Sequence, residues 1–133
     1  VDAEQGLVVP VIRNVDQKDL FTVGREFRER VEAVRSRKIN PEHLSGGTFT
    51  ITNLGMYDVD GFTPVINLPE AAILGVGRIA PKPVVLNDQI VIRKMMTLSL
   101  VFDHRLTDGA PAARFEQYLK ELIESPNEVT LTK

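Results

Sequence analysis

The sequence predicts a mixed α/β fold in which two amphipathic helices pack with several short strands. Apolar residues recur at steps of three and four between positions 19 and 37 and again between 110 and 124, the period of a helix with one buried face. Short runs rich in β-branched residues lie before the first helix and between the two helices. With 133 residues, 43% of them hydrophobic, the chain suits one domain with a packed core.

The N-terminal segment is expected to form a strand followed by a helix. LVVPVI at 7–12 is apolar and β-branched, which predicts a buried strand with an edge position or a bulge at Pro10. Asp16 can cap the helix that follows, which we predict over 19–37. Its charged face is interpreted as solvated rather than as a phosphate site. The expected buried face consists of Leu20, Val23, Phe27, Val31 and Val34.

The middle of the chain alternates between strands and turns. NPEHLSGG at 40–47 is a turn cluster, and TFTITNL at 48–54 has the composition of a strand. GMYDVDG at 55–61 is predicted to be a loop with a glycine at each end. FTPVINLPE at 62–70 is expected to be extended but irregular because two prolines interrupt it. AAILGVGRI at 71–79 predicts another buried strand.

The C-terminal third is predicted to be a hairpin, a polar loop and a helix. The hairpin covers 83–102, turns at Asn87-Asp88, and has a long second arm that ends at Phe102. DHRLTDG at 103–109 is the loop, and the helix runs from about residue 110 to 124. The expected buried side of this helix consists of Ala113, Phe115, Tyr118, Leu119, Leu122 and Ile123.

Composition excludes several classes of function. The formal charge is −2, from 16 basic and 18 acidic residues, so a nucleic-acid partner is not expected. Cysteine is absent, which removes disulfides, thiolate catalysis and cysteine-based zinc sites. No apolar stretch approaches the ~20 residues that span a bilayer, so no membrane association is expected.

The residue types that move protons near neutral pH are few. His43 lies in the turn cluster and is interpreted as an ordinary surface histidine. His104 follows a long apolar strand and is flanked by Asp103 and Arg105, with Asp108 four positions later; this context allows a general base or a local ion pair. A metal site on Asp103, His104 and Asp108 lacks the usual ligand spacings, so we expect no metal. The chain also lacks the G-x-S-x-G motif of serine hydrolases.

The loop DHRLTDG resembles the DHRxxDG signature of the dihydrolipoamide acyltransferases of the 2-oxo-acid dehydrogenase complexes. GLVVPVI, GGTFTITNLG, FTPVINLPEAAILGVGRI, MMTLSLVFDHR and DGAPAARF resemble further family blocks, in family order. The resemblance runs from Val1 to about Pro126 and implies a chloramphenicol acetyltransferase-like mixed-sheet sandwich. Because the family domain is longer, residues 1–133 are expected to be its C-terminal portion, with only the second half of the domain present.

The resemblance also implies roles for individual residues. His104 corresponds to the family's general base, and Asp108 to a loop position that holds the loop in shape. Thr52 corresponds to a hydroxyl residue that donates to the oxyanion, although Thr50 shares its strand face and the pattern alone does not separate the two. The reaction moves an acyl group between dihydrolipoamide and coenzyme A. Acetyl is favoured, as in pyruvate dehydrogenase complexes, with branched-chain acyl and succinyl left open.

The family's assembly completes the expectation. It implies a homotrimer whose active sites lie between subunits, trimers joined into a larger core, and a lipoyl domain and coenzyme A as substrate partners. Decarboxylase and dihydrolipoamide dehydrogenase components would bind through domains outside this sequence. The expected location is the cytoplasm, or the mitochondrial matrix in a eukaryote. The alternative is an assembly fragment of the complex core without catalysis.

Overall fold

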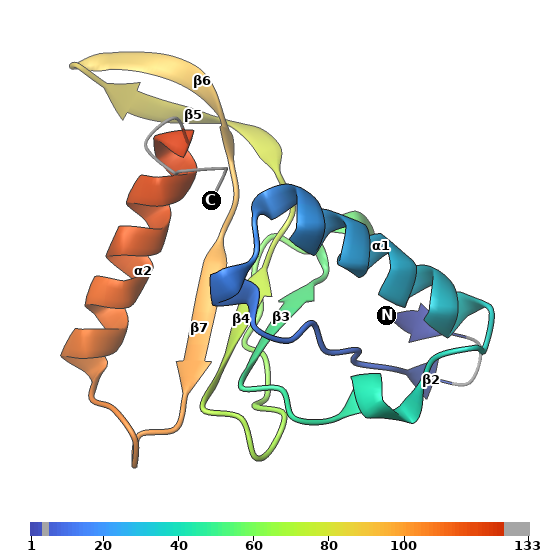
Figure 1. Cartoon of the computed structure of the whole chain (residues 1–133). Helices are drawn as coiled ribbons and strands as arrows, with labels where there is room; N and C mark the ends of the chain where they lie inside the picture. Colours follow the sequence, from blue (N-terminus) through green and yellow to red (C-terminus); the bar gives the residue numbers. More distant parts are fainter. Residues whose placement is uncertain (4–5, 127–133) are drawn as a thin grey trace. The chain divides into compact units, whose positions relative to one another are not determined.

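The computed structural model describes residues 1–3 and 6–126 (Figure 1). The chain divides into two compact units. Of the described residues, the first unit contains those up to Gly47 together with 120–126, and the second contains Thr48–Leu119. Helices and a mixed sheet are both present, so the predicted α/β class is confirmed. None of the helices in the described ranges is long and apolar enough to cross a membrane.

The strand predicted at 7–12 is wrong beyond Leu7. The first unit opens with two short antiparallel strands, β1 (Asp2–Ala3) and β2 (Gly6–Leu7), and the chain then continues without regular structure up to η1 (Val15–Gln17). Pro10 has no amide hydrogen to give to a strand ladder, and the amide of Val11 donates to the carbonyl of His43 at 2.7 Å. The segment is therefore tied to the 40–47 turn instead of to a sheet.

The first predicted helix is present as α1 (Leu20–Arg35), but its cap and its burial differ from the prediction. The Asp19 carboxylate, not Asp16, accepts the capping hydrogen bond, from the Thr22 amide at 2.6 Å. Of the predicted buried face only Val34 is buried, at 1% exposed, while Leu20 and Phe27 are exposed. Helical spacing identifies side chains that share a face, but the burial of that face depends on a neighbouring element.

The second unit is built on a three-stranded sheet with the strand order β3-β4-β7. β3 (Phe49–Asn53) and β4 (Ala72–Val76) are parallel, whereas β7 (Leu98–Phe102) runs antiparallel to β4. The strands predicted at 48–54 and 71–79 are confirmed, and the 40–47 turn contains the short helix η2 (Pro41–Leu44). The sheet is mixed because the connection at 54–71 carries the chain back to the level at which β3 begins, so that β4 runs parallel to β3.

The predicted hairpin is confirmed at its turn and corrected in its second arm. β5 (Ala80–Leu86) and β6 (Gln89–Met95) pair around Asn87-Asp88, whose φ angles of 50° and 60° fit a type I′ turn. The arm predicted to continue to Phe102 breaks after Met95, and β7 belongs to a different sheet from β6. The break falls where the carbonyl of Thr97 accepts a hydrogen bond from the amide of Gly77.

The last helix is α2 (Gly109–Glu124), as predicted, but its buried position is Ala112. Ala113, Phe115, Tyr118 and Ile123 are exposed, and Leu119 and Leu122 are half-buried, so the predicted buried side is wrong in most positions. Within the second unit the Phe115 ring lies 6.0 Å from that of Phe49, and Glu116 accepts from the Leu100 amide at 3.1 Å. These contacts hold the middle of α2 against β3 and β7.

Candidate functional site

His104 lies two residues beyond the end of β7, in a short loop that leads into α2. The amide of Asp103 donates to the carbonyl of Ala71 at 2.9 Å, which fixes the end of β7 beside the start of β4. The Asp103 carbonyl accepts from the amide of Leu106 at 2.9 Å, which closes the turn around the histidine. The imidazole is therefore held close to the end of the sheet by a short turn.

The loop is stiffened by an ion pair between its first and third residues. The Arg105 guanidinium donates to both Asp103 oxygens, at 2.6 Å to Oδ2 and 3.0 Å to Oδ1, and the Arg105 amide also donates to Oδ1. Hydrogen bonds from Arg105 lower the pKa of Asp103 from 3.8 to about 2. Asp103 is thus ionised and paired with Arg105. This pairing argues against Asp103 as a ligand in the metal site considered from the sequence.

His104 and Asp108 are brought together, as their spacing predicted. His104 Nδ1 lies 3.7 Å from Asp108 Oδ1, and both side chains are well exposed, at 72% and 87%. The Phe102 ring lies 5.3 Å from the imidazole, centroid to centroid, with the two ring planes tilted by 47°. With Nδ1 directed at a carboxylate, Nε2 is the nitrogen open to a reacting proton.

The structure separates the two threonines that the sequence left as alternatives. Thr50 is buried at 8% exposed, and its hydroxyl donates to the carboxylate of Glu70, itself buried at 7% and also bonded by Asn67. Thr52 is half-buried, and within residues 1–3 and 6–126 its hydroxyl has no hydrogen-bond partner. Of the two threonines, Thr50 therefore has a hydroxyl that is already used in a hydrogen bond, and Thr52 does not in the part of the chain described.

Thr52 lies beside a strand position without a side chain. Its register partner on β4 is Gly75, and the next partner, on β7, is Ser99. A Cβ atom on Gly75 would lie 3.2 Å from the ring of Phe62 and from Pro64 Cδ. The face that carries Thr52 is thus closed at this position by Phe62 and Pro64, two residues of the 62–70 segment.

Thr52 and His104 are not brought together within one chain. Thr52 is two strands away from Ser99, about 10 Å across the sheet, and Phe102 lies three positions beyond Ser99, about 10 Å along β7. The amide of Asp103 continues the pairing beyond Phe102, to the carbonyl of Ala71, and His104 is the next residue. The two candidates therefore belong to different ends of the β3-β4-β7 sheet.

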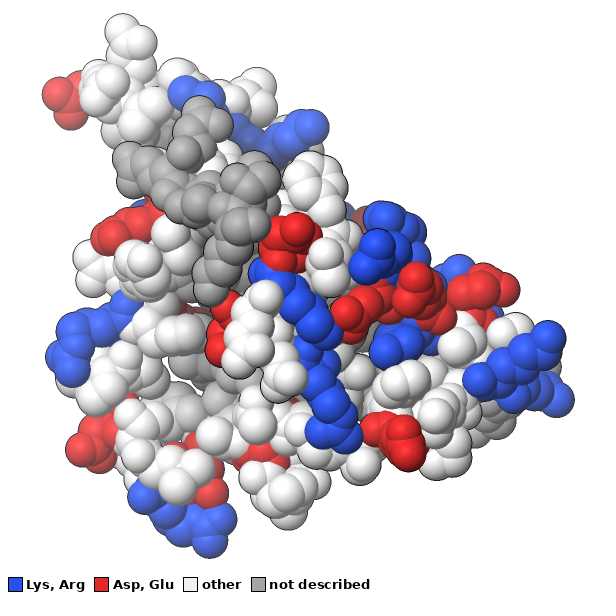
Figure 2. Space-filling model, viewed as in Figure 1, with Lys and Arg blue, Asp and Glu red and all other residues white. Residues whose placement is uncertain are grey.

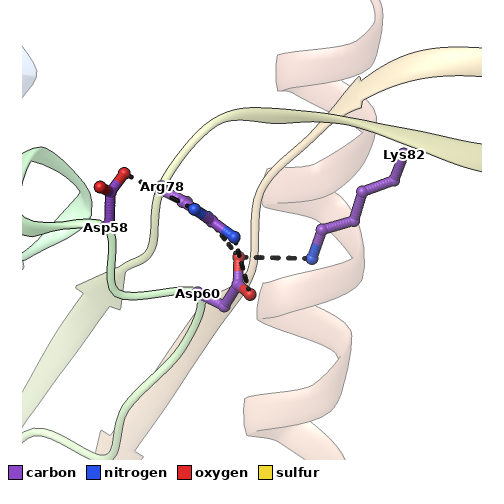
Figure 3. A network of polar contacts seen from close by, with 4 residues as sticks. All are labelled: Asp58, Asp60, Arg78 and Lys82. Carbon is purple, nitrogen blue, oxygen red and sulfur yellow. Dashed lines mark hydrogen bonds and ion pairs between the residues drawn. The ribbon is translucent and has the colours of Figure 1, made fainter.

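A polar network that the sequence did not predict lies near the Thr52 end of the sheet (Figure 3). Arg78 binds Asp60 at 2.8 Å and Asp58 at 3.5 Å, and Lys82 lies 3.5 Å from Asp60. Hydrogen bonds between Arg78 and Asp60 lower the pKa of Asp60 and raise that of Arg78. The two aspartates of the loop, at positions 58 and 60, indicate a cationic partner. No local sequence pattern identifies that partner as Arg78, which lies eighteen positions from Asp60.

The first unit holds a polar hollow of about 720 Å³ between α1 and the 40–47 turn. His43 lines it and is half-buried, so this histidine is less exposed than predicted. Two of the side chains that line the hollow, Lys18 and Glu26, form an ion pair at 2.8 Å. On the face of the molecule seen in Figure 2, acidic and basic side chains are interspersed. Nowhere in the described ranges do three or more His, Asp or Glu side chains form a group that could hold a metal ion.

Comparison with known proteins gives concordant matches. The family model for the 2-oxoacid dehydrogenases acyltransferase (catalytic domain) matches residues 1–131. The dihydrolipoyllysine-residue acetyltransferase component of the pyruvate dehydrogenase complex of Rickettsia felis is 43% identical over 95% of this chain and 31% of its own length. That of Bacillus subtilis is 44% identical over 94% of this chain and 28% of its own length.

Solved structures match over a larger share of their chains. One is the cubic core of a pyruvate dehydrogenase multienzyme complex, with a TM-score of 0.87 and 46% identity over 92% of this chain and 50% of that chain. The same values hold for the Azotobacter vinelandii dihydrolipoamide acetyltransferase, studied for a serine, a histidine and an asparagine in its catalytic mechanism. A probable dihydrolipoamide acetyltransferase from Listeria monocytogenes has a TM-score of 0.92 and 36% identity, over 99% of this chain and 57% of that chain. The chain thus spans less than a third of the curated relatives and about half of the solved chains.

Proposed function

Because this chain belongs to the 2-oxoacid dehydrogenases acyltransferase (catalytic domain) family, as its motifs predicted, we propose that it is the C-terminal portion of a domain that transfers an acetyl group between dihydrolipoamide and coenzyme A. The observation that carries the proposal is the imidazole of His104, presented at the end of β7 with Nδ1 facing Asp108. The curated relatives named above are acetyltransferases, which favours acetyl over branched-chain acyl or succinyl.

The proposed chemistry needs a base and an oxyanion donor. A thiol with a pKa of about 8.5 is mostly protonated at neutral pH, so His104 Nε2 takes the thiol proton of coenzyme A as its sulfur attacks the thioester carbonyl. The Thr52 hydroxyl donates to the oxygen that becomes negative. When the C–S bond to dihydrolipoamide breaks, the imidazolium returns the proton to the departing sulfur. Both substrates are thiols or thioesters, and the sequence of steps uses no metal ion.

The spacing of the three residues supports these roles. In the Azotobacter vinelandii enzyme the serine precedes the histidine by the same number of positions as Thr52 precedes His104. The asparagine follows that histidine at the fourth position, as Asp108 follows His104. A threonine hydroxyl can replace a serine hydroxyl as a donor, and a carboxylate can replace an amide oxygen as the acceptor that holds the loop.

The distance between Thr52 and His104 leads us to propose a site shared between protomers. Since one chain keeps the two at different ends of its sheet, His104 of one protomer would work with Thr52 of a neighbour in a homotrimer. The cubic core of a related complex is consistent with trimers that join into a larger core. The lipoyl domain, decarboxylase and dihydrolipoamide dehydrogenase would be the partners, in the cytoplasm or, in a eukaryote, the mitochondrial matrix.

An assembly role without catalysis is the second candidate. It is favoured by the many large apolar side chains that remain exposed in residues 1–3 and 6–126, such as Ile51 at 68% and Ile92 at 77%. Surfaces of this kind are typical of interfaces. Under this candidate the protein would form a core of defined size but would not transfer acetyl groups.

Mixed assemblies of two inactive variants test the proposal. In the full-length protein, His104→Ala and Thr52→Val should each remove most acetyl transfer, by about 10²-fold or more. Co-expressed in equal amounts, the variants should recover about a quarter of wild-type activity, because one site in four then combines an intact histidine with an intact threonine from different chains. The control is co-expression of two differently tagged His104→Ala chains, which should stay inactive.

The outcomes separate the candidates. Absence of recovery, with both single variants inactive and assembled, would contradict the shared site. Undiminished transfer by His104→Ala would contradict the proposed catalysis altogether. A wild-type protein that assembles but transfers no acetyl group from acetyl-CoA to dihydrolipoamide would favour the assembly role.

A further inference from the structure

The loop at 55–61, which follows the strand of Thr52, lies in close contact with the end of β4. The amide of Arg78 donates to the carbonyl of Val59 at 2.8 Å. A Cβ atom on Gly77 would overlap the carbonyl of Asp60, and one on Gly55 would lie 2.8 Å from Arg78 Cα. The two backbones therefore approach each other as closely as glycine allows.

Ion pairs clamp this contact from the outside (Figure 3). The Arg78 guanidinium donates from Nε to Asp60 Oδ1 at 2.8 Å and from Nη2 to Asp60 Oδ2 at 3.3 Å. This two-point geometry fixes the orientation of the carboxylate as well as its distance. Asp58 approaches Nη1 at 3.5 Å from the other side, so Arg78 lies between two loop residues.

Both ends of the clamped loop connect to Thr52. At its start, the side chain of Asn53 accepts from the amide of Gly55 at 2.8 Å, and the amide of Leu54 donates to the carbonyl of Val76 at 3.2 Å. At its end the chain continues into Phe62, whose ring closes the space above Gly75, the register partner of Thr52. A displacement of the loop would therefore shift both the strand that carries Thr52 and the ring next to it.

We propose that Arg78 is a positioning residue for the acyl transfer proposed above: by clamping the 55–61 loop it fixes the direction of the Thr52 hydroxyl toward the reacting carbonyl oxygen. This inference rests on the proposed role of Thr52. An oxyanion donor acts only when it is aimed within a few tenths of an ångström, so a residue that holds the strand end contributes to kcat without touching substrate.

Arg78→Met in the full-length assembled protein removes the clamp and keeps much of the side-chain length. We expect kcat to fall about tenfold while both KM values stay within about twofold, because a misplaced donor weakens the transition state more than the bound substrates. Arg78→Lys should recover part of the loss. Lys82→Met is the matched control: Lys82 lies 3.5 Å from Asp60 Oδ1, whereas Arg78 binds both oxygens of that carboxylate at 2.8 and 3.3 Å, so removal of the lysine should leave kcat unchanged.

A double-mutant cycle with Thr52→Val distinguishes positioning from general weakening of the fold. If Arg78 acts through the Thr52 hydroxyl, Arg78→Met should lower kcat no further once that hydroxyl is gone. Losses that multiply in the double variant, or an unchanged kcat in Arg78→Met, would overturn the inference alone. An undiminished kcat in Thr52→Val would overturn the proposed oxyanion role and this inference with it. Should Arg78→Met fail to assemble, Asp60→Asn opens the clamp from the loop side and carries the same expectations.

Discussion

The two ends of the β3-β4-β7 sheet hold their candidate catalytic groups in different ways. At the His104 end, the charged side-chain contacts join residues of the loop itself: Asp103 to Arg105, and His104 to Asp108. At the Thr52 end, the contacts join residues far apart in the chain, such as Asp60 with Arg78. One end is a local loop attached to a strand, and the other is part of the packing of the second unit.

This difference predicts how each end responds to substitution. The His104 side chain is 72% exposed, so its replacement should alter chemistry and leave folding almost unchanged. Near the Thr52 end the backbones approach closely at Gly55 and Gly77, so replacements of these glycines should change stability, and position as a consequence. Substitutions at the two ends therefore test whether turnover can change without a change in stability at the His104 end but not at the Thr52 end.

The largest expected effect is that of His104→Ala on turnover. Loss of a positioned base should lower kcat by about 10²–10⁴-fold, while the free energy of unfolding changes by no more than about 0.5 kcal/mol. Steady-state acetyl transfer and urea titration of the full-length protein measure the two quantities. His43→Asn is the control, because it removes the other histidine of the sequence, to which no role in the transfer is assigned. A large loss of stability in His104→Ala would mean that the loop is not an independent local structure.

The next largest effect is expected at the opposite end, from Gly77→Ala. The added methyl group would overlap the carbonyl of Asp60, and backbone cannot move aside as a flexible side chain can. We expect the free energy of unfolding to fall by about 3 kcal/mol, the upper part of the range for overpacked sites. Gly24→Ala in α1 is the matched control, because its methyl group would meet only the Arg28 guanidinium, at 3.9 Å, and alanine favours the helix by about 1 kcal/mol. Equal stability of the two variants would refute the close approach.

The same contrast between local and distant contacts explains what the sequence could predict of the fold. Both helices, the Asn87-Asp88 turn and the strands at 48–54 and 71–79 follow from residue periodicity and turn chemistry, which act over a few positions. The strand predicted at 7–12 does not form beyond Leu7, and the segment is instead held by a hydrogen bond from Val11 to His43. These residues are thirty-two positions apart, so no local pattern indicates the contact. Burial of the helix faces failed for a related reason, since periodicity does not reveal what covers a face.

The candidate site divides in the same way. The pairing of His104 with Asp108 was predictable because four positions separate them in a tight loop. The choice between Thr50 and Thr52 was not predictable, because both side chains lie on the same face of the strand. The two differ only in the folded chain, where the Thr50 hydroxyl donates to the buried carboxylate of Glu70, on another segment. The clamp of Asp58 and Asp60 by Arg78 was missed because its partners come together only when β4 has paired with β3.

A smaller effect should separate the two threonines at the Thr52 end. Thr50→Val leaves the buried carboxylate of Glu70 without its hydroxyl donor, which should lower the free energy of unfolding by about 1–3 kcal/mol. Thr52→Val removes a hydroxyl without a partner in the described ranges and should change stability by less than about 0.5 kcal/mol while kcat falls. Urea titration and acetyl-transfer rates on both variants provide the measurement. The reverse pattern would assign the free hydroxyl to Thr50.

The smallest effect is expected in the ion pair of the His104 loop, where pH is the variable. Because Arg105 lowers the pKa of Asp103 to about 2 in the folded protein, the pair stabilises the fold above the unfolded-state pKa of about 4. That stabilisation disappears as the pH falls from about 4 to about 2. Asp103→Asn should therefore lower the melting temperature slightly at pH 6, with a difference from wild type that shrinks toward pH 2 and in high salt, since Arg105 is 84% exposed. Arg105→Met should lose stability over the same pH window and add nothing to Asp103→Asn. Equal melting temperatures for Asp103→Asn and wild type at every pH would show that Asp103 holds the loop through its backbone alone, and that this end of the sheet owes its shape to the strand terminus and not to charge.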